Sequence, residues 1–372
     1  MKRWMKGGMF ALLLFALAVF LVGCGGGPMS GSWPGLLVAD GIVYAATADK
    51  VYALEVETGQ IKWEFDPENA TEMAFAAPTV VEGTVYICSA DIRSAKGRIY
   101  ARDADSSEER LFFPSEEDQQ VGAFYAAPLV VDDTLYVGST DHRVYALDIA
   151  TRTKRWEVST GGWIWATPLF DDGRLYVSSM DHKVYRLDAE SGHKEWEFQA
   201  GGAVAATPAL AGGMLYFGAF DGKLYALDAT AGEKRWEFAT EVPSTQKQNW
   251  IWGTPAVVSD TVYIGSLDHK VYALDAVTGA KRWEEVLDGA IRAGPVYSDG
   301  MLYVGSENGQ LYVLDANTGG QKWSFSAQAP ILTPPVIADH LVYITSLDGK
   351  VYALDVSTHT QKWIFPPPEE KE

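Results

Sequence analysis

Histidine next to aspartate is the pairing in this chain that could do chemistry most directly. Such pairs occur at one place of the repeat in three copies, Asp141-His142, Asp181-His182 and Asp268-His269. Imidazole and carboxylate groups are common metal ligands. The same positions of other repeats hold Asp221-Gly222 and Asp348-Gly349, however, and Asp and Gly are typical turn residues. We therefore interpret the pairs as turns and predict no metal site.

Cysteine is the other residue type with reactive potential, and the 372-residue chain contains only Cys24 and Cys88. Two cysteines are too few for a disulfide framework or a cysteine-rich metal site. Cys88 falls within a predicted strand where other repeats carry Gly or Ser, so we expect a small, buried side chain. The sequence shows no Gly-rich phosphate loop, no Ser-His-Asp set and no isolated carboxylate pair. We therefore expect no catalytic residues and no cofactor.

Cys24 follows a stretch with the character of an export signal. A basic start precedes the apolar run Met9–Val22, which is typical of a signal peptide. The run ends in Leu21-Val22-Gly23-Cys24, which resembles a bacterial lipoprotein signal. The resemblance implies a signal peptide over residues 1–23, lipidation of Cys24 and a lipidated tether over residues 24–33. An ordinary cleaved signal with an incidental cysteine is the alternative.

These features predict a location in the cell envelope. The lipid would anchor the chain to the outer membrane of a bacterium with two membranes, or to the outer face of the plasma membrane of a bacterium with one. The formal net charge is −19, and an acidic surface repels nucleic acid. We therefore expect contacts with a membrane, through the lipid on Cys24, and with envelope proteins, but none with nucleic acid.

A unit of about 40 residues recurs eight times and organises the rest of the chain. In each copy a Tyr is followed 11 residues later by a Trp, or by Leu111 in the second copy. The Tyr residues are Tyr52, Tyr100, Tyr145, Tyr185, Tyr225, Tyr272, Tyr312 and Tyr352. The Trp residues are Trp63, Trp156, Trp196, Trp236, Trp283, Trp323 and Trp363. A Trp repeated at one place is expected to be structural, wedged between neighbouring units.

Each unit is predicted to form four short strands. Runs of β-branched and aromatic residues, split by Asp-Gly or Asp-His, are strand and hairpin signals. In the fourth unit the strands are expected at 168–170, 175–177, 184–187 and 195–198. Repeats of this length with four strands predict an all-β fold, an eight-bladed β-propeller of four-stranded antiparallel blades over residues 34–366. A two-sheet sandwich is the alternative, but it would not need a Trp at one fixed place.

The repeat resembles a known family. The pattern Tyr-Ala-Leu-Asp-Ala-x-Thr-Gly-x-x-x-Trp is similar to the quinoprotein (PQQ-type) propeller repeat over residues 36–365. Large quinoprotein alcohol dehydrogenases share it with small exported propellers similar to BamB, the lipoprotein of the outer-membrane barrel-assembly machinery. The length of the chain and the lipoprotein-type signal favour the second group. The dehydrogenases use a vicinal Cys–Cys disulfide, a bound Ca²⁺ and an Asp base, and this sequence has no Cys–Cys pair.

The insertions between repeats predict a binding face. With the strands of a blade named A to D from the centre outward, the D–A links and the B–C turns share one face of the ring. The B–C step is 14 residues in the second unit instead of the usual 9, and the links before Pro78, Pro128 and Pro255 are long. Repeat proteins place such elaborations on the face that binds a partner. We expect the same here.

A Pro recurs at one place of the repeat from the second unit on. The residue three positions before this Pro should lie near the mouth of the central channel. These residues are Phe75, Tyr125, Trp165, Ala205, Trp252, Arg292 and Leu332, and two positions earlier come Met73, Trp163 and Trp250. Aromatic side chains with a single Arg suit an anionic ligand or a peptide terminus. The alternative, that these side chains simply plug the channel, stays open.

We therefore predict a non-catalytic, membrane-anchored, monomeric propeller that serves as a protein-interaction scaffold in the bacterial cell envelope. The BamB likeness implies a role in outer-membrane protein assembly. The alternatives are a PQQ-dependent oxidoreductase and a sugar- or peptide-binding propeller. Trp363-Ile364-Phe365 should supply the outer strand of the last blade, so we expect no strand from residues 25–33 to close the ring. Residues 367–372 should form a solvated acidic tail.

Overall fold

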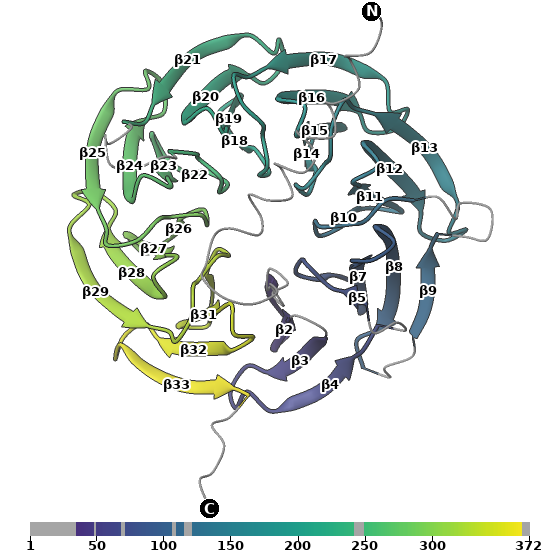
Figure 1. Ribbon diagram of the computed structural model, residues 1–372, viewed down its shortest axis with the longest axis horizontal. Helices are drawn as coiled ribbons and strands as arrows, with labels where there is room; N and C mark the ends of the chain where they lie inside the picture. The colour runs from purple at the N-terminus through teal and green to yellow at the C-terminus, as the bar shows by residue number, and fades with distance from the viewer. Residues whose placement is uncertain are drawn as a thin grey trace, which may run out of the picture. The chain divides into compact units, whose positions relative to one another are not determined.

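The computed structural model describes residues 35–47, 50–67, 71–105, 109–114, 121–241 and 249–366. These residues form eight antiparallel sheets around a common centre, which confirms the predicted β-propeller and excludes a two-sheet sandwich (Figure 1). Seven blades have four strands in chain order, and the second blade has a fifth, short strand. The predicted signal peptide, Cys24, the tether and the acidic tail lie outside the described residues. No helix among the described residues is long and apolar enough to cross a membrane.

The blades are numbered in chain order, with the first strand of each at the centre. Blade 1 contains β1 (Gly35–Ala39), β2 (Ile42–Ala46), β3 (Val51–Glu55) and β4 (Ile61–Phe65). Blade 2 contains β5 (Glu72–Met73), β6 (Thr79–Val81), β7 (Thr84–Asp91), β8 (Lys96–Asp103) and β9 (Glu109–Phe113). Blades 3 and 4 contain β10 (Leu129–Val131), β11 (Thr134–Gly138), β12 (Arg143–Asp148), β13 (Lys154–Ser159), β14 (Leu169–Asp171), β15 (Arg174–Ser178), β16 (Lys183–Asp188) and β17 (Lys194–Gln199).

The second half of the ring repeats the same arrangement. Blades 5 and 6 contain β18 (Ala209–Ala211), β19 (Met214–Gly218), β20 (Lys223–Asp228), β21 (Lys234–Ala239), β22 (Ala256–Val258), β23 (Thr261–Gly265), β24 (Lys270–Asp275) and β25 (Lys281–Val286). Blades 7 and 8 contain β26 (Val296–Ser298), β27 (Met301–Gly305), β28 (Gln310–Asp315), β29 (Gln321–Ser326), β30 (Val336–Ala338), β31 (Leu341–Thr345), β32 (Val351–Asp355) and β33 (Thr360–Phe365).

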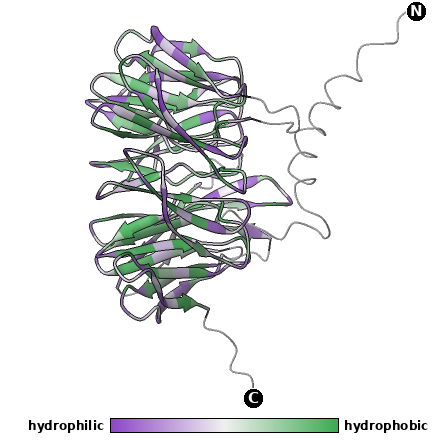
Figure 2. Cartoon of the chain, turned by 90° about the vertical axis from the view of Figure 1, so that its left-hand side faces the viewer, coloured by the Kyte–Doolittle hydropathy of each residue, from purple (hydrophilic) through white to green (hydrophobic). Residues whose placement is uncertain are grey.

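The apolar pattern of each strand follows from its depth in the blade. The second strand of a blade is covered on both faces by the neighbouring blades, so every residue of β23 is buried. The outermost strand is covered on one face only, and β17 accordingly alternates between exposed and half-buried residues. Figure 2 shows the result, with hydrophobic residues concentrated in the strands of the blades.

The repeated Trp lies at the seam between its own blade and the next, as predicted. The indole N–H of Trp156 donates to the carbonyl oxygen of Ala189 in blade 4 over 3.1 Å, and the hydroxyl of Tyr136 donates to the same oxygen over 3.0 Å. The ring also lies against Gly192 (φ +71°) of the next blade, where an added Cβ would be 2.8 Å from the indole. Equivalent hydrogen bonds are made by Trp63, Trp196, Trp236, Trp283 and Trp363. The Gly of the repeat therefore permits this close approach of the indole as well as supplying the positive φ.

Blade 2 corrects one detail of the sequence alignment, in which Leu111 takes the place of the Trp. The irregularity in pairing falls between Ile99 and Tyr100 in this blade, whereas in blade 3 it falls two residues later in the repeat. Leu111 therefore pairs with Tyr100. Phe112 is buried and lies 5.6 Å from Tyr86, which is the ring contact that Trp makes in other blades. Phe112, not Leu111, is the counterpart of the Trp, because the bulge has moved.

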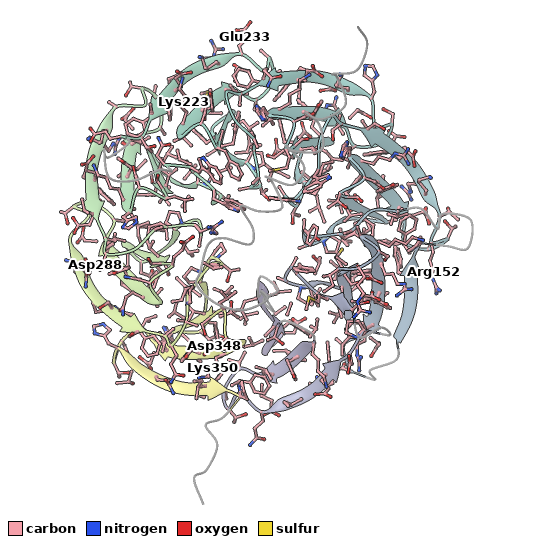
Figure 3. All side chains as sticks on the ribbon, viewed as in Figure 1. Arg152, Lys223, Glu233, Asp288, Asp348 and Lys350 are labelled. Carbon is pink, nitrogen blue, oxygen red and sulfur yellow. The ribbon has the colours of Figure 1, made fainter. Side chains whose placement is uncertain are left out.

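The C–D turn of blade 3 also departs from the repeat. Arg152 of blade 3 occupies the turn position that Gly192 fills in blade 4, and each donates its backbone N–H to the preceding Asp carbonyl. Arg152 keeps the positive φ, at +57°. Figure 3 shows Arg152 at the outer edge of the ring. In blade 8 the position is His359, whose ring stacks on Trp323 at 4.8 Å.

The ring closes by packing of blade 1 against blade 8, which lie side by side in Figure 1. Within the described residues, blade 8 is built from its own four strands, with β33 outermost. The indole N–H of Trp363 donates to Val56 O over 2.8 Å, and Lys362 pairs with Glu57 at 2.5 Å. The last blade therefore takes its outer strand from the predicted residues, while the prediction that residues 25–33 add no strand lies outside the described part of the chain.

Candidate functional site

Backbone hydrogen bonds fix the D–A links against the B–C turns on one face of the ring. The N–H of Met180 donates to Trp163 O over 2.8 Å, and the N–H of Leu267 donates to Trp250 O over 3.0 Å. The same bond recurs between Phe220 and Ala203. The links and turns therefore share a face, as predicted, and each link presents its residues beside the turn of its own blade.

Five aromatic side chains from blades 4, 5 and 6 form a continuous group on this face. We call Trp163, Trp165, Phe220, Trp250 and Trp252 the aromatic cluster. Trp165 and Trp252 stack with ring centroids 6.2 Å apart, and Phe220 stacks on Trp250 at 4.5 Å with an interplanar angle of 6°. Trp163 contacts Trp165 at 5.7 Å, and Phe220 contacts Trp252 at 4.6 Å. Four side chains that the sequence nominated separately thus meet in one place.

The cluster is neither fully buried nor freely exposed. Trp252 is 9% exposed, while Trp163, Trp165, Phe220 and Trp250 are half-buried. Trp252 is thus an interior side chain of the mouth, and the other four still present ring surface to solvent. Half-buried aromatic groups held by their neighbours are typical of the central part of protein interfaces.

Arg292 extends the cluster on the blade 7 side. Its guanidinium lies 4.5 Å from the Trp252 ring, within the range of a cation–π contact. It also forms an ion pair with Glu307, 2.6 Å between Nη2 and Oε1, and Nε donates to the same oxygen over 2.8 Å. Glu307 thus already balances the charge that was expected to attract an anion. A ligand carboxylate would have to displace or share this partner.

Two other predicted residues of the mouth form an aromatic pair of their own. Phe75 and Tyr125, from the links into blades 2 and 3, contact each other edge to face at 4.7 Å. Burial raises the pKa of the Tyr125 hydroxyl, so this group stays neutral. Ala205 is buried and Leu332 is half-buried. The aromatic mouth is therefore two separate groups, the cluster in blades 4 to 6 and this pair.

Sequence reasoning missed Phe220 and Glu307. Each directly precedes the turn residue that recurs in the B–C hairpins, Asp221 in blade 5 and Asn308 in blade 7. Other blades carry Thr140, Met180, Leu267 and Leu347 there. The residue type varies at this position, although the neighbouring turn residue is nearly always Asp. This variation was the signal that could have identified the two residues, because it marks a side chain that the turn itself does not need.

The Asp residues of the B–C turns serve the fold, which confirms their interpretation as turns. In blade 3, Asp141 accepts the backbone N–H of Arg143 over 3.1 Å and the hydroxyl of Tyr145 over 2.6 Å. His142 supplies the positive φ of +72° that Gly provides elsewhere. Asp181, Asp221 and Asp268 accept the hydroxyl of the repeat Tyr in the same way. Burial, followed by these hydrogen bonds, raises the pKa of the repeat Tyr residues.

Blade 2 replaces this Asp with a residue from a link. Glu72 of β5 has a side chain only 1% exposed. Its carboxylate accepts the hydroxyl of Tyr100 over 2.9 Å, and it also accepts hydrogen bonds from Ser89 Oγ and from the Arg98 guanidinium. A Ser, an Arg, a Tyr and a carboxylate together resemble a catalytic group. The position of Glu72 as the counterpart of the turn Asp shows that it stabilises the long hairpin.

The fold and its repeat define the class of protein as a PQQ-type β-propeller. A family model described as outer membrane protein assembly factor BamB matches residues 25–112, 95–284 and 267–371. The chain therefore belongs to the BamB family. No curated protein sequence matches the chain.

Solved structures share the fold at low sequence identity. BamB from Moraxella catarrhalis superposes with a TM-score of 0.70 at 20% identity, covering 85% of this chain and 94% of that one. The computationally designed Ika8 protein gives 0.70 at 19% identity, covering 87% and 96%. A quinohemoprotein alcohol dehydrogenase from Comamonas testosteroni gives 0.70 at 15% identity, covering 87% of this chain and 71% of that one. At these identities the likeness concerns the fold.

The likeness to dehydrogenases raises the question of a quinone cofactor. The family resemblance implies a vicinal disulfide and a Ca²⁺ site for such a group. Cys88 is buried, and burial raises the pKa of its thiol, so it stays a protonated thiol. In the described part of the chain, no three His, Cys, Asp or Glu side chains are grouped as metal ligands. The residues present do not fit that cofactor site.

Proposed function

We propose that this chain is a non-catalytic scaffold of the bacterial cell envelope, anchored through lipid on Cys24, that binds protein partners in outer-membrane protein assembly. Membership of the BamB family supports the role. The observation that carries the binding function is the aromatic cluster, in which half-buried rings from three blades meet on the face that carries the long links and the long hairpin.

The cluster suits a protein partner because of its composition and its fixed geometry. Trp is enriched among the residues that contribute most to protein–protein affinity. Rings that are already stacked lose little conformational freedom on binding, so more of the contact energy appears as affinity. Side chains that only plug the channel would need to be buried, whereas Trp163 and Trp250 are only half-buried.

Affinity capture from native envelopes tests this proposal. The tagged full-length chain is compared with a Trp163→Ala/Trp250→Ala variant, with Ile61→Ala as the control because Ile61 is 51% exposed on an outer strand. At about 1–2 kcal/mol for each truncation, the double variant should bind its partner roughly 30-fold to 1000-fold less tightly. The control should capture normally. Equal capture by the double variant would show that the rings only plug the channel.

The enzyme alternative has its own test. PQQ with Ca²⁺ is added to the purified chain and the melting temperature is measured. We expect no change. A rise in melting temperature that depends on both additions would favour a quinone-dependent oxidoreductase instead.

A further inference from the structure

The B–C hairpin of blade 2 is longer than those of the other blades. Strands β7 and β8 have eight residues each, compared with five and six in blade 3. The pairs Ser89↔Arg98, Ala90↔Gly97 and Asp91↔Lys96 extend beyond Cys88↔Ile99, the counterpart of the last pair in blade 3. Three further pairs add about 10 Å of strand on the face that holds the aromatic cluster. We call residues 89–98 the extended hairpin.

A buried ion pair holds the extended hairpin in place. Glu72 accepts hydrogen bonds from Ser89, Arg98 and Tyr100, all of them on the two strands of this hairpin. A buried carboxylate costs several kcal/mol unless it is paired, and Glu72 has one cationic partner, the half-buried Arg98, and two hydroxyl donors. The short strand β5 adds Glu72↔Asp91 and Met73↔Ala90 to the same edge. The buried carboxylate of Glu72 thus fixes the conformation of the extended hairpin, a segment that the other blades lack.

The base and the tip are ordered in the same way. A Cβ on Gly97 would lie 2.4 Å from the Phe124 ring, so the hairpin packs closely on the link into blade 3. At the tip, Asp91 Oδ1 accepts the backbone N–H groups of Arg93 and Ser94 over 2.8 and 3.1 Å. The N–H of Ile92 donates to Thr71 O over 3.0 Å. The tip therefore has one defined conformation before any partner arrives.

The tip carries an apolar side chain between two cations. Ile92 is 54% exposed, and Arg93 and Lys96 are exposed. Neither cation forms an ion pair with a described residue. Within residues 89–98, Arg93, Lys96 and Arg98 outnumber the one acidic residue, Asp91, whereas the whole chain has a net charge of −19. Fully burying an exposed Ile side chain contributes about 1.5–3 kcal/mol, so burying the exposed half of Ile92 would contribute about 1–1.5 kcal/mol to an interface.

We propose that the extended hairpin is a recognition element that inserts Ile92 into an apolar socket of a partner protein, with acidic side chains around the socket facing Arg93 and Lys96. This rests on the proposed scaffold function. A lipid surface is the less suitable occupant, because each cation contributes only about 1 kcal/mol there and the rest of the chain is acidic. A tip held in one conformation loses little conformational freedom on binding, which favours a folded protein as the partner.

A photo-reactive amino acid in place of Ile92 tests the proposal in the full-length chain, in the cells that produce it. The control position is Val277, which is 77% exposed on a C–D turn of the opposite face. We expect a protein adduct from position 92 and none from position 277, with Asp or Glu flanking the cross-linked residue when the adduct is sequenced.

Charge variants make the test specific. In the labelled chain, Arg93→Glu/Lys96→Glu should reduce the adduct at least roughly tenfold, whereas Arg93→Lys/Lys96→Arg should retain it. Both pairs should melt like the parent because the side chains are exposed. Equal labelling at both positions, an adduct with lipid, or no effect of charge reversal would overturn the proposal.

The result is separable from the test of the scaffold function. Normal partner capture by the wild type, with loss on removal of Trp163 and Trp250 but no adduct at position 92, would reject the hairpin and retain the scaffold. An adduct at position 92 that depends on charge, with capture unaffected by the Trp variant, would retain the hairpin and move the interface away from the aromatic cluster.

Discussion

Gly279 in the C–D turn of blade 6 combines two demands that a single substitution can separate. Its φ is +72°, which favours Gly, and a Cβ placed on it would lie 2.6 Å from Cε3 of Trp236 in blade 5. Gly300 in the A–B turn of blade 7 has a similar φ of +79° but nothing within 4 Å of its Cβ position. The two glycines therefore share the backbone conformation and differ in the neighbouring Trp.

The magnitudes follow from these two terms. Gly300→Ala should cost about 1–2 kcal/mol, the penalty of an L-residue in the left-handed region. Gly279→Ala should cost the same plus about 1–3 kcal/mol for overpacking, because the indole is held between blades and by its hydrogen bond to Ala276 O. The difference of about 1–3 kcal/mol measures the close approach of the two blades.

The assay is urea unfolding followed by Trp fluorescence and circular dichroism, with the transition midpoints compared between variants. Trp236→Phe in combination with Gly279→Ala completes a double-mutant cycle, and the smaller ring should recover part of the loss. Equal losses at the two glycines, or additive effects in the cycle, would refute the seam as the reason for the Gly.

Three further outcomes are expected from the structure. Glu72→Ala should lower the free energy of unfolding by about 1–3 kcal/mol, because it leaves the buried Tyr100 hydroxyl without its acceptor, and hydrogen exchange should show faster opening of the extended hairpin. The Arg282 guanidinium and then Thr278 hold the pKa of Asp275 below its usual range, so ionised Asp275 stabilises the folded state above about pH 4. This contribution is lost on acidification, and stability should fall as the pH drops below about 4. In acid titrations followed by fluorescence, Arg282→Gln should flatten this loss. Cys88 should resist maleimide at pH 8 in the native protein and react at once in urea, because burial raises the pKa of its thiol and excludes the reagent; rapid native labelling would contradict the buried position.

The repeat made most of the fold predictable. Strands alternate with a period of two residues, and Asp-Gly or Asp-His marks the turns, so the four strands of the fourth unit were placed correctly as β14 to β17. Placement failed at Leu111, because a β-bulge is decided by the pairing of two strands and leaves no fixed mark in either one. Phe112 became the counterpart of Trp for that reason.

The candidate site was predictable in part. Trp163, Trp165, Trp250 and Trp252 were identified from their distance to a Pro, because the register of each link is fixed by the strand that follows it. Phe220 and Glu307 were missed, since they belong to turns whose proximity to the links depends on how a blade folds back on itself. Glu307 changes the chemistry of the site, because it neutralises the guanidinium of Arg292.

The sequence by itself determined the number of blades, the order of their strands and the face that carries the insertions. These properties depend on local patterns that repeat eight times, and the same residue spacing in each copy predicts the same strands and turns. Only the tertiary structure decided which unlike residues meet: Arg292 with Trp252, Phe220 with Trp250, and Glu72 with Tyr100. Contacts between different blades or between a link and a hairpin are set by packing of the whole ring, so no single copy of the repeat contains them.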